Sequence, residues 1–206
     1  MTKIMENKKL IYSLILFIIV IYVNEWLAIN QPTPKDNTPL KDEIHELFPR
    51  ISSSYANTLL AFFTIYGICR LFYYKDSVDI LMKFLNITSL IFIIRALSFS
   101  LTHMPFIRGL NCDNPSKWGH RFFFLYDIHA CGDYFISGHT VIGVLIFLIT
   151  LKHSKYKLEK IIMGILTIIL LMTTVIGRLH YSVDIINGVV YSLMGWLVYN
   201  YYQILY

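Results

Sequence analysis

Six long apolar runs constrain the fold of this chain more than any other feature. They cover residues 10–29, 55–74, 84–104, 136–151, 161–176 and 182–202. Most of them approach the roughly 17 to 25 residues that a helix needs to cross a bilayer. The chain is 56% hydrophobic and only 15% charged, whereas soluble domains carry about a quarter charged residues. This excludes a soluble or disordered chain, so we expect an all-α, polytopic membrane protein with six transmembrane helices.

The first run needs a separate argument because it resembles a signal peptide. Lys8 and Lys9 precede a strictly apolar core at residues 14–21, as in a cleaved leader. No small-x-small cleavage site follows, so we expect the run to persist as a span. No repeat or low-complexity linker divides the sequence, and residues 1–206 are therefore predicted to form a single membrane domain.

Basic residues predict the orientation of the spans. Ten of the 18 Lys and Arg residues lie in short segments on the side that holds both termini. They are Lys3, Lys8, Lys9, Arg70, Lys75, Lys83, Lys152, Lys155, Lys157 and Lys160. The positive-inside rule then places both termini in the cytosol and the long loops at 30–54 and 105–135 in the lumen or exterior. The net charge of +5 is read as this orientation signal, and no nucleic-acid partner is expected because no basic run carries interleaved aromatic residues.

Ionisable residues gather where two spans begin on the lumenal side. His139 lies in Cys-Gly-Asp-Tyr-Phe-Ile-Ser-Gly-His-Thr at 131–140, and His180 and Asp184 lie in Gly-Arg-Leu-His-Tyr-Ser-Val-Asp at 177–184. A spacing of four predicts that His180 and Asp184 share one helix face, with the carboxylate holding one imidazole nitrogen. A histidine held in this way can act as a nucleophile, while His139 supplies and removes protons.

Residues that favour an anion surround these histidines in the sequence. Ser137 and Gly138 offer a hydroxyl and backbone N–H groups at a helix start. Arg95 and Arg178 add guanidinium groups suited to phosphate oxygens. We therefore predict a phosphoester site at the lumenal membrane surface. Two alternatives stay open: a His/Asp pair that only neutralises itself, and a zinc ion held by His139 together with that pair.

Four segments together resemble the sphingomyelin synthase family, a branch of the phosphatidic acid phosphatase superfamily, over about residues 37–200. The two specific segments are 131–140 and 180–184. Residues 39–42, Pro-Leu-Lys-Asp, look like the family's first motif, although Lys41 stands where a proline is usual. Residues 95–102 are similar to the second motif in part.

The resemblance implies a ceramide phosphotransferase that works without a metal or other cofactor. His180 would attack the phosphorus of a glycerophospholipid, Asp184 would orient it, and His139 would protonate the departing diacylglycerol. The phosphohistidine would then pass its head group, phosphocholine being the first expectation, to the primary hydroxyl of ceramide. Leu179 stands where animal members carry an acidic residue that bears on head-group choice, so ethanolamine and inositol phosphates stay open.

Several rival interpretations also stay open. Water could intercept the phosphohistidine, which would give a lipid phosphatase or phospholipase C. The Pro-Ser-Gly-His motif of the lipid phosphatases is absent, since Ile136 precedes Ser137. The chain could also be a catalytically silent scaffold or scramblase. The compartment (Golgi, endoplasmic reticulum or plasma membrane) and a homo-oligomeric state are not determined by the sequence.

Other residues receive secondary predictions. Asp133 and Tyr181 are candidate substrate contacts, and Asp127 is a weaker one. Cys112 and Cys131 fall in the same lumenal loop, where a disulfide closing about 20 residues would contribute roughly 3 kcal/mol. The remaining histidines have no partner spacing and are expected to be structural: His45, His103, His120, His129 and His153.

Overall fold

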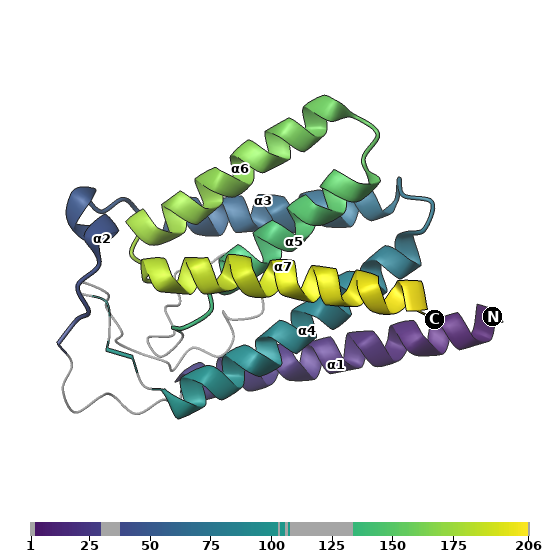
Figure 1. Cartoon of the computed structure of the whole chain (residues 1–206), viewed down its shortest axis with the longest axis horizontal. Helices are drawn as coiled ribbons and strands as arrows, with labels where there is room; N and C mark the ends of the chain where they lie inside the picture. The colour runs from purple at the N-terminus through teal and green to yellow at the C-terminus, as the bar shows by residue number, and fades with distance from the viewer. Residues whose placement is uncertain (1–2, 30–37, 103, 106, 108–133, 206) are drawn as a thin grey trace.

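The computed structural model describes residues 3–29, 38–102, 104–105, 107 and 134–205. The regular elements in these ranges are all helices, with no strand among them (Figure 1). The helices are α1 (Lys3–Ile29), α2 (Glu43–Leu47), α3 (Ser54–Leu71), α4 (Ser77–Leu101), α5 (Gly138–His153), α6 (Lys157–Ile176) and α7 (Ser182–Leu205). The six long helices occupy the six apolar runs, which confirms the all-α class. The short helix α2 lies in a segment where no helix was predicted.

Two helices begin well before the apolar runs that predicted them. The first helix begins at Lys3 rather than at Leu10, and α4 begins at Ser77 rather than at Phe84. Backbone hydrogen bonds need no apolar side chains, so a polar first turn extends a helix beyond its apolar part. The apolar run therefore marks the segment suited to lipid or to the core, not the whole helix.

Within the ranges that the structure describes, four helices, α1, α4, α6 and α7, are long and apolar enough to cross a membrane by length and composition. Helix α5 is apolar but shorter. The outer face of α6 exposes Ile161, Ile165 and Ile168, while Met163 and Leu170 of the same helix are buried. A continuous apolar exterior of this kind suits lipid rather than water. The chain is thus a helical membrane protein, and the six-span topology with its orientation stays a prediction.

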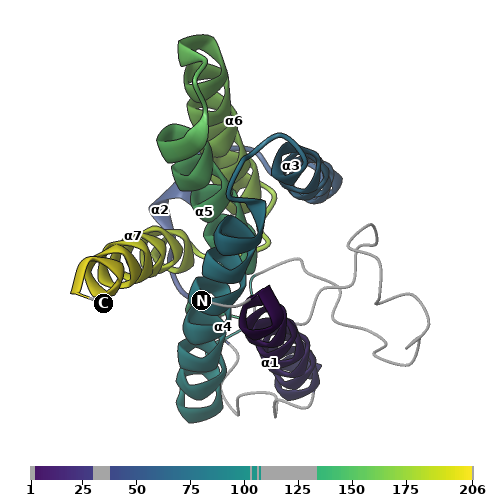
Figure 2. The same cartoon turned by 90° about the vertical axis from the view of Figure 1, so that its right-hand side faces the viewer.

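Helix α5 is the centre of the bundle. It packs against α3, α4, α6 and α7, whereas α1 packs on α4 (Figures 1 and 2). Val141 and Leu145 on one face of α5 pack into one buried hydrophobic cluster. Ile142 and Ile146 on another face pack into a second such cluster. Because α5 is covered on several sides, an all-round apolar sequence suits it.

A close approach of α5 and α7 brings the starts of these two helices together. A Cβ placed on Gly188 would lie 2.8 Å from both Cβ and Cγ2 of Thr140 and 3.2 Å from the carbonyl oxygen of Ser137. Only a residue without a side chain fits there, because a Cβ atom cannot rotate out of the way. This contact sets the distance between the two segments that carry His139 and His180.

Candidate active site

The two histidines singled out by the sequence lie side by side at one end of the bundle. His139 is the second residue of α5, and His180 lies in the turn between α6 and α7. Their ring centroids are 6.2 Å apart and the ring planes are inclined by 68°. His180 is only 5% exposed, and His139 is partly buried. The fold therefore brings together two residues that are 41 positions apart in the chain.

The prediction that His180 and Asp184 share a helix face is wrong. Helix α7 begins at Ser182, so Asp184 lies in its first turn and His180 precedes it. The pair meets nevertheless, with Nδ1 of His180 3.3 Å from Oδ2 of Asp184. The turn after α6 folds the imidazole back over the start of α7, which gives the expected contact without the expected helix.

Asp184 is fully buried and is held by backbone donors from two segments. Its Oδ1 accepts a hydrogen bond from the N–H of Phe135 at 2.9 Å, and its Oδ2 accepts one from the N–H of Tyr181 at 3.0 Å. These bonds fix the carboxylate beside Nδ1 of His180, so Nε2 is the nitrogen of that ring left to meet a substrate.

Two residues beside the histidines have positive φ angles, which residues other than glycine rarely adopt. Phe135 has φ 96° and Arg178 has φ 58°. The first donates its N–H to Asp184 and accepts a hydrogen bond from Asn187 Nδ2 at 2.9 Å. The second ends α6, and its N–H donates to Val175 O at 2.8 Å. Such conformations cost on the order of 1–3 kcal/mol each and recur at functional sites, where the surrounding contacts hold them.

His139 is anchored by Asn57 of α3, a residue that the sequence analysis did not select. Nε2 of His139 lies 2.8 Å from Oδ1 of Asn57. An amide oxygen only accepts hydrogen bonds, so this contact places a hydrogen on Nε2 and fixes the ring plane. The sequence could have indicated Asn57, because it is a polar residue within an apolar run. Such residues are costly in a membrane unless they bind a partner or a substrate.

Arg95 is buried and lies against the start of α5. Its Nε donates to the carbonyl of Ile136 at 2.8 Å, and its guanidinium carbon is 4.9 Å from the ring centroid of Phe92. A Cβ on Gly138 would be 3.7 Å from Arg95 Nη2. The guanidinium thus adds positive charge beside the N-terminus of α5, where the helix dipole also favours an anion.

Ser137 caps α5, and it is fully buried. Its Oγ accepts a hydrogen bond from the N–H of Thr140 at 3.3 Å, and its own N–H donates to Asp184 O at 3.1 Å. The residue therefore joins the start of α5 to the start of α7. Its predicted contact with substrate stays a prediction.

Tyr181 is buried, and its hydroxyl bonds to backbone groups. It accepts a hydrogen bond from the N–H of Leu40 and donates one to the carbonyl of Pro105, both at 3.2 Å. Burial, followed by the nearby carboxylates of Asp184 and Asp42, raises the pKa of this phenol, although the Leu40 N–H acts in the opposite direction. Through these bonds Tyr181 connects the histidine turn to the segments of Leu40 and Pro105. Its contact with substrate stays a prediction.

The segment before and within α2 packs directly on the histidine turn. Asp42 caps α2 and also accepts hydrogen bonds from the backbone and the hydroxyl of Ser182. The ring of His45 stacks on Tyr181 with centroids 5.7 Å apart, and its Nε2 donates to the carbonyl of His180 at 3.2 Å. His45 has no partner at helical spacing, as the sequence indicated, and its partners come from residues far along the chain.

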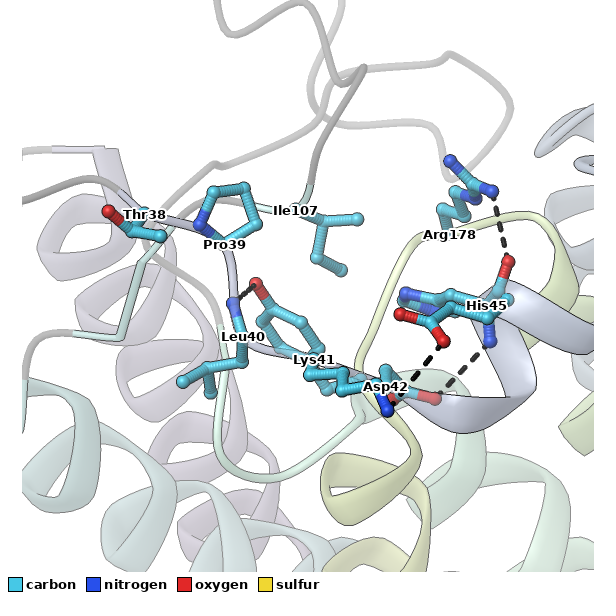
Figure 3. A pocket seen from close by; sticks show the side chains of 10 residues that line it. Thr38, Pro39, Leu40, Lys41, Asp42, His45, Ile107 and Arg178 are labelled. Carbon is cyan, nitrogen blue, oxygen red and sulfur yellow. Dashed lines mark hydrogen bonds and ion pairs between the residues drawn. The ribbon is translucent and has the colours of Figure 1, made fainter.

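A cavity of about 700 Å³ opens beside this turn (Figure 3). Its lining includes His45, Tyr181, Lys41 and Arg178. Arg178 Nη2 donates to the carbonyl of His45 at 3.0 Å, and its Nε is buried without a hydrogen bond within the part of the chain that the structure describes. Arg178 therefore lines the cavity two residues before His180, and its buried Nε is a donor not used by the described residues.

Some predicted residues lie outside the described ranges. They are Asp133, Asp127, the Cys112–Cys131 disulfide, His103, His120 and His129. Within the described ranges, no three His, Cys, Asp or Glu side chains converge in a way that could hold a metal ion. The zinc alternative therefore lacks a converging set of ligands there.

Tyr134 is a further residue that the sequence analysis missed. It is buried, and its ring meets that of His180 edge to face with centroids 6.3 Å apart. It also packs on Tyr181 at 5.5 Å. Tyrosines are so frequent in this chain that no local signal separated this one from the others.

A family model matches the part of the chain that contains the candidate site. Residues 130–201 match the family model described as PAP2 superfamily C-terminal. This stretch contains His139, His180 and Asp184, and it supports the phosphatidic acid phosphatase superfamily branch of the resemblance. The match indicates an enzyme of lipid phosphatase or phosphotransferase type that acts on phospholipid-like substrates. A search of the curated proteins found no match.

Proposed function

We propose that this chain is a ceramide phosphotransferase of the sphingomyelin synthase type. It would move a phospho-head group, phosphocholine first among the candidates, from a glycerophospholipid to the primary hydroxyl of ceramide. The observation that carries the proposal is the alignment of Asp184, His180 and His139, with a buried carboxylate at one end and two adjacent imidazoles. In this arrangement Asp184 orients His180 as the nucleophile from one side, and His139 lies on the other side as the acid/base group.

In the first step, Nε2 of His180 attacks phosphorus, and a P–N bond forms while the P–O bond to diacylglycerol breaks. His139 donates a proton to the departing oxygen. Asp184 stabilises the positive charge that develops on His180, as buried carboxylates do for imidazoles. The 6.2 Å between the two ring centroids supports a phosphoryl group bound between the rings.

In the second step, His139 removes the proton from the hydroxyl of ceramide. The oxygen attacks phosphorus, the P–N bond breaks, and the phosphosphingolipid leaves. Two in-line displacements give net retention at phosphorus. Arg95 and the start of α5 would stabilise the phosphoryl oxygens in both steps, because they supply fixed positive charge next to His139.

The choice of ceramide as acceptor depends on the family resemblance of residues 39–42 and 131–140. Asp42, from the first of these segments, bonds to Ser182 beside the histidine turn, which supports a role for that segment at the site. The proposed setting is a Golgi, endoplasmic reticulum or plasma membrane, with cytosolic termini and the site on the lumenal or exoplasmic face.

The test uses membranes containing the full chain, a fluorescent ceramide and one defined donor at a time: phosphatidylcholine, phosphatidylethanolamine or phosphatidylinositol. A new phosphosphingolipid is expected with at least one donor. It should vanish in His180→Ala and fall by about 10³–10⁴-fold in Asp184→Asn, which removes the charge while keeping the shape. His153→Ala is the matched control, since His153 ends α5 at the other end of the helix from His139.

Other outcomes would contradict the proposal. Release of a water-soluble phosphoester by wild type but not by His180→Ala, without any ceramide product, would identify a lipid phosphatase or phospholipase C. Lipid scrambling or no activity at all, by folded protein and unchanged in His180→Ala, would identify a non-enzyme.

A further inference from the structure

Two lysines lie close together at the end of the bundle opposite the histidines. Lys83 lies in the second turn of α4, and Lys152 lies in the last turn of α5. Nζ of Lys152 donates to Oδ1 of Asn200 at 3.1 Å, and Nζ of Lys83 donates to the same oxygen. Asn200 follows Ser182 by 18 residues, hence by roughly 27 Å along the axis of α7.

Lys83 turns into the protein rather than toward the surface. It is only 4% exposed, and its ammonium lies 3.7 Å from the ring centroid of Trp196 and 5.5 Å from that of Tyr199. A lysine at a membrane edge ordinarily extends its charge to the lipid head groups. Here the charge is held under an indole ring on the side of α4 that faces α7.

One neutral oxygen is a poor match for two ammonium groups. The Asn200 side chain is oriented by its own Nδ2, which donates to the carbonyl of Trp196 at 2.8 Å. Among the described residues, no carboxylate forms an ion pair with Lys83 or Lys152. The two ammonium groups repel each other, and an anion bound between them would offset this repulsion.

We propose that Lys83, Lys152 and Asn200 form a binding site for a phosphate-bearing anion, separate from the histidine site. The two ammonium groups would contact the phosphate oxygens, and Trp196 would form one wall. Basic pockets between membrane helices bind anionic head groups in this manner. A lipid head group or a free phosphate could supply the anion, and the chemistry is the same for both.

The experiment measures binding to the full chain in nanodiscs and does not depend on turnover. One arm titrates phosphatidylglycerol into phosphatidylcholine nanodiscs, and the other adds inorganic phosphate to nanodiscs of phosphatidylcholine alone. The readout is the rise in melting temperature, with sodium chloride at matched ionic strength as the reference. We expect a saturable rise in at least one arm, and the arm that responds identifies the source of the anion.

Variants separate a defined site from a generally basic surface. Lys152→Gln and Lys83→Gln should each weaken the apparent affinity about tenfold, because each removes a charge-assisted hydrogen bond. Lys155→Gln is the matched control, an exposed lysine three residues beyond Lys152. If burial makes Lys83→Gln unstable, the exposed Lys152 still decides the test. No rise in either arm, or an equal loss in Lys155→Gln and Lys152→Gln, would overturn the proposal.

Discussion

Asp42 holds Ser182 through two hydrogen bonds, from the backbone N–H to Oδ2 at 2.6 Å and from the hydroxyl to Oδ1 at 2.8 Å. These residues are 140 positions apart in the chain. Since Ser182 begins α7 two residues after His180, the carboxylate of Asp42 fixes one end of the histidine turn. Asp184 fixes the same turn from within the bundle through the Tyr181 N–H.

Asp42→Asn should destabilise the protein and lower its activity. The amide keeps one acceptor oxygen, so one of the two bonds to Ser182 is lost together with the charge. We expect the free energy of unfolding in detergent to fall by about 1–3 kcal/mol. Glu46→Gln, an exposed acidic residue in the same short helix, is the control and should change stability by less than about 0.5 kcal/mol. Equal effects of the two substitutions would contradict the role of Asp42.

The stabilising effect of Asp42 should depend on pH. Burial alone would raise the pKa of this carboxyl, but hydrogen bonds from Ser182 and the influence of His45 outweigh it and hold the pKa below its ordinary value. A lowered pKa in the folded state stabilises the fold above the pKa of the unfolded chain, about 4, and this stabilisation is lost as pH falls toward the folded-state value. The difference in unfolding free energy between wild type and Asp42→Asn should therefore be constant from pH 7 to about 5 and shrink below about 4. A difference that grows on acidification would refute this.

The sequence predicted the helices well because each apolar run is long and is bounded by polar residues. It also predicted that His139, His180 and Asp184 would meet, since two specific motifs open neighbouring helices at one end of the bundle. The contact between His180 and Asp184 was right, but its geometry was wrong, because the positive φ of Arg178 ends α6 and leaves His180 in a turn. A positive φ at a residue other than glycine leaves no pattern in the sequence from which it could be predicted.

The residues that hold the site in place could not be predicted from local patterns. His45 and Asn57 bond to groups 135 and 82 positions away, respectively. Such partners depend on how the helices pack, and neither residue has a partner at helical spacing. The selected residues Ser137 and Tyr181 bond mainly to backbone groups in the described structure, which shows that residue type alone does not separate substrate contacts from structural ones.

Asn57→Leu should lower kcat about 10²-fold, because a poorly positioned acid/base group costs about that much, while KM and the melting temperature change little. The substitution removes the acceptor that holds Nε2 of His139. Asn57→Asp keeps an acceptor oxygen in the same place and should restore much of the rate. Thr58→Ala, at the exposed neighbouring position, is the control. A fall in stability without a change in kcat would mean that Asn57 acts only in packing.

Gly188→Ala should destabilise the bundle and reduce activity, because the added Cβ would lie 2.8 Å from Thr140 and would force α5 and α7 apart. Overpacking of this kind costs about 1–3 kcal/mol, and it would move His139 relative to His180. Gly164→Ala is the matched control. Its Cβ would meet a ring carbon of Phe147 at 3.3 Å, and that side chain can shift, while alanine favours the helix by up to about 1 kcal/mol. Thermal unfolding and the ceramide assay should therefore separate the two variants. If both glycines tolerate alanine equally, the close approach of α5 and α7 does not set the spacing of the histidines.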